Sequence, residues 1–372
     1  MTNIAFTGDI AFSKHFSGKF TDEKLLSDEI VEFLSSSDYT VANVEGAVSS
    51  EKASADKPLL HANPVECVEW IKKINGNIWN LGNNHTTDCG KNGVISTLDA
   101  ARSMGAVPLG LGLNEEEAKK PVIINESGGI GMVSVTYPKY AAKGDSCGCF
   151  RCDDEEEIKR VIADIKAKNR WCIMVTHEGH EFSQIPMPYL RNKYHRFLEY
   201  GADIVVGHHP HVVQNYEKVG DKIIFYSLGN FIFDTDFQRL QNHTENGILL
   251  KLSFTEDSYS WEHLPILIDR EENRVKTGTT PDIFTHIGRG QYNLLWPLAG
   301  WDLCRNEKKK HAYTKPHMKD YSWLDWLFKW ELKRMNQPQG KYLMIGRFLS
   351  IFQIWRFADK KLKKYIIAKK EK

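Results

Sequence analysis

The segment most suggestive of chemistry is Gly207-His208-His209-Pro210-His211, which places three imidazoles within four residues. It directly follows the apolar residues 204–206. Imidazole is a frequent ligand of divalent transition metals, and three of them beside glycine and proline make a poor packing element. The segment therefore predicts metal binding by His208, His209 and His211.

Four other polar clusters follow short apolar runs in the same way. They are Gly8-Asp9, Asn43-Val44-Glu45, Gly82-Asn83-Asn84-His85, and the run from Thr176 through His177 and His180 to Glu181. Any one of them alone could be an ordinary turn or helix cap. In layered folds, however, the carboxyl ends of parallel strands meet at one edge, where functional side chains collect. We therefore expect the five clusters to bring carboxylate, amide and imidazole groups to one rim.

The elements that must position these clusters alternate between strands and helices over the first 280 residues. This alternation is typical of a layered α/β fold in which helices cover a sheet. The predicted strands are 4–7, 39–44, 77–81, 130–136, 171–176, 204–206, 222–227 and 247–254. The predicted helices begin at Asp22 and after Asn63-Pro64, and span 92–104, 154–168 and 189–200.

The composition is that of a globular protein. The chain has 372 residues, of which 41% are hydrophobic and 26% charged, enough for one large domain or two smaller ones. The first residues show no basic leader, and no uncharged run approaches 18 residues, so neither a cleaved signal nor a membrane span is expected. Seven cysteines form an odd set, which favours a reducing compartment and predicts a cytoplasmic location.

The charge of the chain is divided unevenly along its length. Residues 301–372 hold 19 lysines and arginines against 7 acidic residues, which leaves 30 basic and 41 acidic residues in 1–300. Five of the ten tryptophans also fall in 301–372. We therefore predict a domain at 1–290 and a basic, helical extension at 291–372.

Within that extension, residues 347–367 have the pattern of a basic amphipathic helix. Such a helix could lie peripherally on an anionic membrane surface, contact a protein partner, or dock on the acidic body of the chain. Nucleic-acid binding is not expected, because no recognised module accompanies the charge.

The ordered motifs FTGDI, NVEGAV, GNNHTTDCG, HEGHEF, GADIVVGHHPHVVQ and YSLGNFIFD resemble the poly-γ-glutamate capsule synthesis (CapA-like) family over about residues 3–254. The domain of that family looks like a variant of the calcineurin-like metallophosphoesterase fold. The resemblance thus implies a four-layered α/β/β/α sandwich that holds two metal ions. It does not cover the extension.

The resemblance also implies roles for individual residues. The implied metal ligands are Asp9, Glu45 as the bridging carboxylate, Asn84, His177, and His211 together with His209 or His208. His85 matches the histidine that protonates the leaving group, beside Asn84. Ile10 and Ala11 stand where the usual Asp-x-His motif would continue, so one site is expected to lack an imidazole.

The mixed nitrogen and oxygen ligands suit Mn²⁺ or Zn²⁺, and also Fe, better than Ca²⁺. We expect one or two divalent ions. Glu181 and His180 are expected to contact the substrate or to orient a ligand. Asn230 could equally be a residue of the site or an amide that fixes the conformation of a loop.

A dense run of thiols, Cys147, Cys149 and Cys152, could bind zinc with a fourth ligand from elsewhere. Its spacing is not that of a standard zinc knuckle, and no second pair lies nearby. The interpretation we favour is a surface loop with reduced thiols.

Two functions are compatible with these observations. The first is a metal-dependent hydrolase that acts on a phosphoester or an anionic polymer. The second is a non-catalytic component of capsule synthesis that binds a metal or an acidic polymer. The pair Asn84-His85 favours the hydrolase, because a structural metal site needs no free proton donor.

Overall fold

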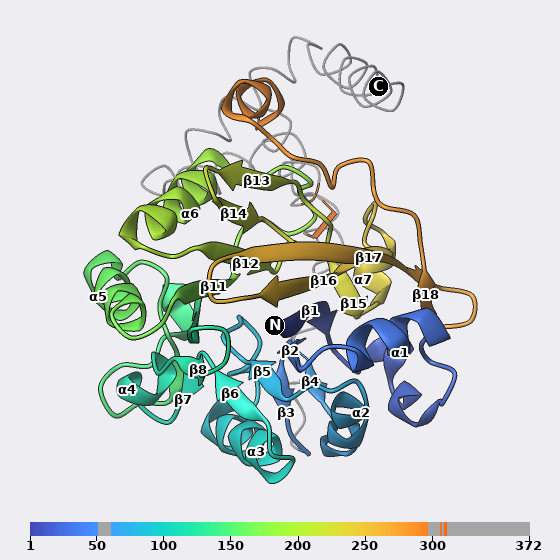
Figure 1. The fold of residues 1–372 in the computed structure, drawn as a ribbon. Coiled ribbons are helices and arrows are strands. Elements are labelled where there is room, and N and C mark those ends of the chain that lie inside the picture. The colour runs from blue at the N-terminus through green and yellow to red at the C-terminus, as the bar shows by residue number, and fades with distance from the viewer. Residues whose placement is uncertain (51–60, 297–305, 307–308, 311–372) are drawn as a thin grey trace, which may run out of the picture.

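Two mixed β-sheets lie face to face in the computed structural model, which describes residues 1–50, 61–296, 306 and 309–310 (Figure 1). The first sheet has the order β18-β17-β16-β1-β2-β5-β6, with β15 also paired to β1. Its strands are β1 (Thr2–Ile10), β2 (Tyr39–Val44), β5 (Ile78–Asn80), β6 (Val107–Leu109), β15 (Asn230–Ile232), β16 (Asn246–Phe254), β17 (Tyr259–Asp269) and β18 (Arg274–Thr277). The strands β1, β2, β5 and β6 run parallel, and β16, β17 and β18 are antiparallel additions.

The second sheet has the order β13-β14-β12-β11-β9-β8. Its strands are β8 (Val122–Ile124), β9 (Ile130–Thr136), β11 (Trp171–His177), β12 (Ile204–His208), β13 (Tyr216–Val219) and β14 (Lys222–Phe225). The central four strands are parallel, and β8 and β13 are antiparallel edges. Two short pairs complete the strands, namely β3 (Ala47–Val48) with β4 (Ala62–Asn63), and β7 (Leu111–Gly112) with β10 (Gly148–Cys149).

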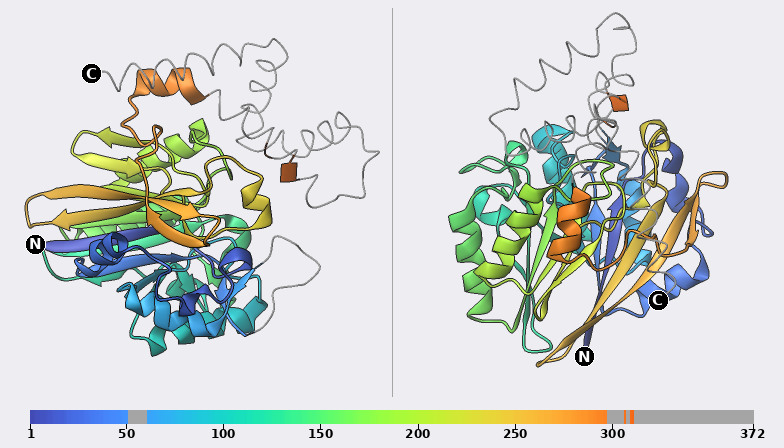
Figure 2. Two further views of the ribbon diagram at one scale, coloured as in Figure 1. Left: turned by 90° about the vertical axis from the view of Figure 1, so that its right-hand side faces the viewer. Right: turned by 90° about the horizontal axis from the view of Figure 1, so that it is seen from above.

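Helices cover the outer face of each sheet, which gives four layers (Figure 2). On the first sheet lie α1 (Asp28–Ser35), α2 (Val68–Lys73) and α3 (Gly90–Ser103), and on the second lie α5 (Glu155–Lys166) and α6 (Pro188–Tyr200). The single turns α4 (Glu115–Ala118) and α7 (Asp236–Arg239) lie in connections. The predicted α/β/β/α sandwich is therefore confirmed.

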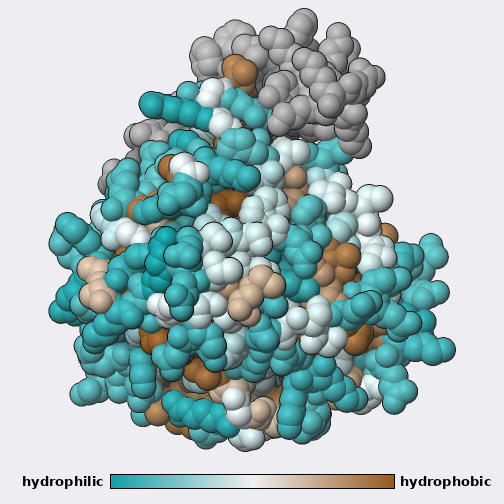
Figure 3. Space-filling view, viewed as in Figure 1, coloured by the Kyte–Doolittle hydropathy of each residue, from teal (hydrophilic) through white to brown (hydrophobic). Residues whose placement is uncertain are grey.

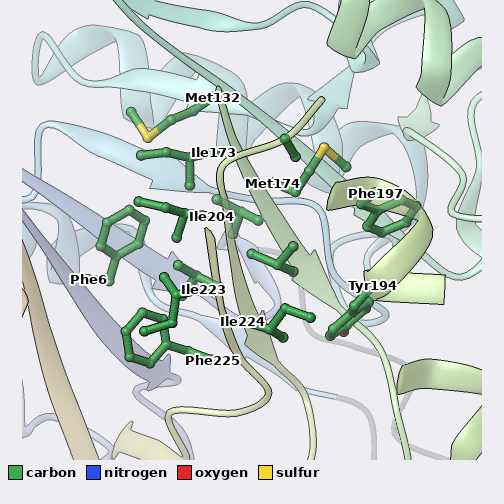
Figure 4. Close-up of a cluster of buried hydrophobic side chains, with 14 of the residues drawn as sticks. Phe6, Met132, Ile173, Met174, Tyr194, Phe197, Ile204, Ile223, Ile224 and Phe225 are labelled. Carbon is green, nitrogen blue, oxygen red and sulfur yellow. The ribbon is translucent and has the colours of Figure 1, made fainter. Parts of the chain in front are cut away.

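The alternation of side chains along a strand produces these layers. In β1, Ile4 and Phe6 belong to the core between the two sheets, whereas Ala5 belongs to the core beneath the helices of the first sheet. Figure 4 shows the core on the second sheet, where Ile204 of β12 lies among side chains of β14 and β11, and Tyr194 marks the packing of α6. Both faces of the central strands of each sheet are thus buried.

Several short strands were not predicted, and two larger differences from the sequence predictions have a physical reason. The helix predicted from Asp22 begins at Asp28, because the preceding residues pair with β18: Val275 donates to the carbonyl of Leu25 (2.8 Å) and Ser27 donates to that of Val275 (3.0 Å). The strand β17, of 11 residues, was not predicted. Its side chains are mostly half-buried, so they lack the strict alternation of apolar and polar residues that indicates a strand.

The described residues reach slightly beyond the predicted boundary at 290. Residues 289–296 are helical, and Tyr292 and Leu295 are buried, with the guanidinium of Arg191 on α6 lying over the ring of Tyr292. The predicted helix at 347–367 lies outside the described residues. In the part of the chain that is described, no helix has the length and apolarity needed to cross a membrane. The face drawn in Figure 3 is mostly hydrophilic, with scattered hydrophobic residues.

The buried position of Phe6 between the sheets yields a test of this packing. We expect Phe6→Ala to lower the free energy of unfolding by about 3–5 kcal/mol, because it removes a fully buried ring. The control Val31→Ala alters a side chain that is 46% exposed and should change that free energy by less than about 0.5 kcal/mol. Urea denaturation measures both, and equal effects would contradict the two-sheet core.

Candidate metal centre

The predicted polar clusters meet at the carboxyl ends of the parallel strands of both sheets. Asp9 comes from β1, Glu45 follows β2 and His85 follows β5, all in the first sheet. His177 ends β11 and His208 ends β12, in the second sheet. The facing arrangement of the sheets therefore brings together residues that are far apart in the sequence, such as Asp9 and His208.

A row of amides holds the carboxylate of Asp9. The strand register places Asn230, Asp9, Asn43 and Asn80 side by side across four neighbouring strands. Asn80 donates to Oδ1 of Asn43 (2.6 Å), and Asn43 donates to Oδ1 of Asp9 (2.6 Å). This chain of hydrogen bonds fixes the orientation of Asp9 and leaves its Oδ2 directed elsewhere.

Glu45 lies at the middle of the cluster and is fully buried. Neither of its carboxylate oxygens has a hydrogen-bond partner among the described residues. Its Oε1 lies 3.6 Å from Nε2 of His211 and 3.8 Å from Nε2 of both His85 and His177. About 3.4 Å separates two ligand atoms around a tetrahedral cation with bonds of ~2.1 Å, so these residues fit a divalent metal.

His211 lies between the two carboxylates. Its Nδ1 is 3.0 Å from Oδ2 of Asp9 and 3.0 Å from Oδ1 of Asn230. The amide nitrogen of Asn230 donates to Gln238 (2.5 Å) and to the carbonyl of Thr244 (2.9 Å), so its oxygen must face the imidazole. The network therefore places a hydrogen of His211 on Nδ1 and leaves Nε2 facing Glu45.

The remaining predicted ligands surround these groups. Nε2 of His177 lies 2.9 Å from Oδ1 of Asn84, and Nδ1 of His208 lies 3.6 Å from Oδ1 of Asp9. The ring centroid of His209 lies 5.1 Å from that of His177. His209 and His211 have φ angles of +95° and +56°, an uncommon backbone that turns both rings into the cluster. The structure thus brings the seven predicted ligands together, while their metal-binding roles stay a prediction.

Two members of the cluster were missed from the sequence. Oδ2 of Asp88 lies 2.7 Å from Nδ1 of His85, so the carboxylate holds the ring and leaves Nε2 facing Glu45. Its position three residues after His85 was a usable signal. His61 contacts His85, with ring centroids 4.2 Å apart, but no strand was predicted directly before it that could have revealed it.

Glu181 and His180 lie at the margin of the cluster. Glu181 forms an ion pair with Lys310 (2.8 Å), and Asn306 donates to the carbonyl of Phe182 (3.0 Å). Burial raises the pKa of Glu181, but the nearby positive charges, chiefly that of Lys310, together outweigh it and lower that pKa to about 2. The ring of His180 packs against Tyr189. Contact of Glu181 or His180 with a substrate stays a prediction.

Burial and neighbouring imidazoles act in opposite directions on the two central carboxylates. Burial raises the pKa of Asp9, but hydrogen bonds from His208 and His211 outweigh it and hold that pKa well below its usual range. Burial raises the pKa of Glu45 well above its usual range, and the charge of Asp9 adds to the rise. Asp9 is therefore ionised more readily than Glu45.

Burial and neighbouring charges also shift the pKa values of the imidazoles in opposite directions. Burial lowers the pKa of His177 well below its usual range and that of His209 to about 3. Burial also lowers the pKa of His211, but the charges of Glu45 and Asp9 outweigh it and raise that pKa to about 9. His177 and His209 are thus neutral, as metal ligation requires, while a metal would displace a proton from His211.

The cysteines of the predicted thiol loop do not gather into a metal site. Cys147, Cys149 and Cys152 are free thiols; Cys149 and Cys152 are buried rather than on the surface, and Cys147 is half-buried. Sγ of Cys149 lies 3.7 Å from the carbonyl of Asn83, and Sγ of Cys152 lies 3.3 Å from Nζ of Lys193. No group of three metal-binding side chains among the described residues includes a cysteine.

Comparison with known proteins places the chain among capsule proteins. A model of the family described as "Bacterial capsule synthesis protein PGA_cap" matches residues 3–235. The "PGA biosynthesis protein CapA" of Bacillus subtilis (strain 168) is 31% identical over 251 residues, which cover 64% of this chain and 65% of that protein. The "Capsule biosynthesis protein CapA" of Bacillus anthracis is 29% identical over 253 residues, which cover 64% of this chain and 61% of that protein.

The match therefore spans less than two thirds of the length of either relative. Among solved structures, TT1561 of Thermus thermophilus is similar with a TM-score of 0.38 and 8% identity, covering 75% of this chain and 98% of the other. That likeness is too weak to bear on the fold.

The geometry around Asp9 yields a test of metal binding. We expect Mn²⁺ or Zn²⁺ at about 100 times its dissociation constant to stabilise the protein by about 2.7 kcal/mol, because the cation binds only the folded chain. Asp9→Asn removes a charged ligand and should abolish most of the rise in the thermal midpoint. Asp236→Asn, at a carboxylate that is 65% exposed, should keep it. An equal rise in Asp9→Asn and in the natural protein would place the cation elsewhere.

Proposed function

Because the chain belongs to the bacterial capsule synthesis protein family PGA_cap, we propose that it is a metal-dependent hydrolase of a phosphoester or an anionic polymer. The observation that carries this proposal is the position of Glu45. Its carboxylate is fully buried, lacks hydrogen-bond donors among the described residues, and faces three imidazoles at 3.6–3.8 Å. Such a group is stable when ionised only beside a positive charge.

The residues that would hold a divalent cation are Asp9, Glu45 and His211, with His177 and Asn84 beside them. A cation bound there lowers the pKa of a bound water and neutralises the charge of an attacked phosphoryl group. Asn43 and Asn230 would orient the ligands, since they contact Asp9 and His211 directly. The mixed ligand set supports Mn²⁺ or Zn²⁺, with Fe as a further option.

His85 is the proposed proton donor. Asp88 accepts a hydrogen bond from Nδ1 of His85, which keeps the ring oriented and places Nε2 towards the centre, 3.8 Å from Glu45. In hydrolysis of a phosphoester, a water oxygen forms the new bond to phosphorus as the bond to the leaving oxygen breaks. The proton on Nε2 of His85 would pass to that leaving oxygen.

A second candidate is a non-catalytic component of polymer synthesis that binds a metal or an acidic chain. The names of both Bacillus relatives describe biosynthesis rather than hydrolysis, and this favours the second candidate. The imidazole of His85, which Asp88 orients towards the centre, favours catalysis. Turnover of a substrate separates the two candidates, because only the first is catalytic.

The first experiment is a metal analysis of the purified protein combined with a screen of phosphomonoester and phosphodiester substrates. We expect His85→Ala to keep the metal content and to lower turnover by about 10²–10⁴-fold, the usual contribution of a proton donor. His263→Ala, at an imidazole on β17 that contacts Thr280, is the matched control and should keep full turnover.

Equal turnover in His85→Ala and in the natural protein would remove His85 from the mechanism. Metal bound without turnover of any phosphoester or anionic polymer would instead support the non-catalytic candidate. A purified protein that binds no divalent metal would overturn the hydrolase and would leave only a component that binds an acidic polymer.

The extension at 291–372 is the proposed contact with a membrane or with the capsule machinery. Charge attraction to the acidic body is largely screened beyond about 10 Å at 0.1 M salt. We expect deletion of residues 340–372 to keep the metal content and to reduce binding to vesicles that contain anionic lipid. Sedimentation with vesicles measures this, and identical partitioning of the two chains would reject the membrane contact.

A further inference from the structure

His61 joins the centre although the sequence analysis did not include it among the ligands. The pairing of β3 with β4 places it there, since Ala47 lies opposite Ala62 in the parallel register. Asn63 also holds this segment close to Glu45, because its side-chain amide donates to the carbonyl of Glu45 (2.9 Å). Gly46 leaves room for the ring, because a Cβ at this position would lie 2.9 Å from Cδ2 of His61.

The side chains of His61, His85 and Glu45 form a compact group of their own. One nitrogen from each imidazole and a carboxylate oxygen of Glu45 all lie within 4.8 Å of one another. Asp9, Glu45 and His211 form a second such group, so Glu45 is shared by both. Asp88 accepts from Nδ1 of His85, which is the usual support of a metal-binding imidazole.

We propose that Glu45, His61 and His85 form a second cation site, and that a divalent ion bound there inhibits the enzyme. This inference rests on the proposed function and assigns a regulation to the same centre. The donor set of two imidazoles and one carboxylate suits Zn²⁺. It differs from the ligand set expected from the sequence, in which His85 is a proton donor and His61 has no role.

The two sites differ in affinity for a physical reason. The Asp9 side offers two carboxylates with His211, whereas the His61 side offers only the shared carboxylate of Glu45. The first cation therefore occupies the Asp9 side, and its charge repels a second one across the shared carboxylate. The site at His61 fills only at a higher concentration of metal.

Filling the second site would stop the proton transfer. The lone pair on Nε2 of His85 cannot bind a cation and carry a proton at the same time. A cation on this nitrogen thus removes the donor that the leaving oxygen needs. Activity should rise as the first equivalent binds and fall as the second one binds.

The test combines calorimetric titration of the metal-free protein with Zn²⁺ and turnover of a phosphodiester at each Zn²⁺ concentration. We expect two equivalents in the natural protein, and a fall in turnover of about 10²-fold or more at the second, the contribution of the lost donor. His61→Phe keeps a ring against His85 and Phe233 but removes the ligand. It should bind one equivalent and show no fall, whereas His263→Ala should behave as the natural protein.

A second equivalent that persists in both His61→Phe and His61→Ala would overturn the inference, as would a single equivalent in the natural protein. Asp9→Asn separates this result from the proposed function. Loss of the activating equivalent in Asp9→Asn, together with an unchanged titration in His61→Phe, would retain the hydrolase and reject only the inhibitory site. A thermal midpoint for each variant within a few degrees of the natural one excludes misfolding.

Discussion

Two carboxylates buried within one cluster are the constraint on which the site depends. Ionised carboxylates are costly to bury unless cations or hydrogen-bond donors face them, and two together repel. The surroundings of the two carboxylates, Asp9 and Glu45, meet this cost in different ways. Asp9 receives an amide hydrogen from Asn43 and lies against His211, whereas Glu45 faces imidazole nitrogens and has no hydrogen-bond donor among the described residues. Because Glu45 lacks the hydrogen-bond donor that Asp9 has, Glu45 is the carboxylate whose charge a bound metal ion would neutralise.

The sandwich is what makes such a cluster possible. Parallel strands end together, so each sheet delivers a line of side chains to its carboxyl edge. Here the first sheet delivers carboxylates and amides, and the second delivers the imidazoles of His177 and His208. Because the carboxyl edges of the two sheets face one another, carboxylates and amides from one sheet lie beside imidazoles from the other.

The alternation of strands and helices predicted a layered α/β fold, and the four layers came only from the family resemblance. The sequence was sufficient for the location of the cluster, because an apolar run followed by polar residues marks the end of a buried strand. It was insufficient where position depends on long-range pairing. His61 reaches Glu45 only because β4 pairs with β3. The residues after Asp22 form a turn and a bridge to Val275 of β18 instead of a helix. The direction of each ring in the GHHPH segment depends on the positive φ angles of His209 and His211, which the residue types do not reveal.

The place of β16 in the first sheet has a practical consequence. The family match ends at residue 235, yet β16 (Asn246–Phe254) pairs with β1 along five residues, and β1 carries Asp9. A fragment cut at the end of the match would turn β1 into an exposed edge strand, with the backbone groups of Ile4 and Phe6 open to pairing with other chains. Such edges promote aggregation. The smallest soluble unit that could retain the centre therefore extends at least through β16 and its cover, β17.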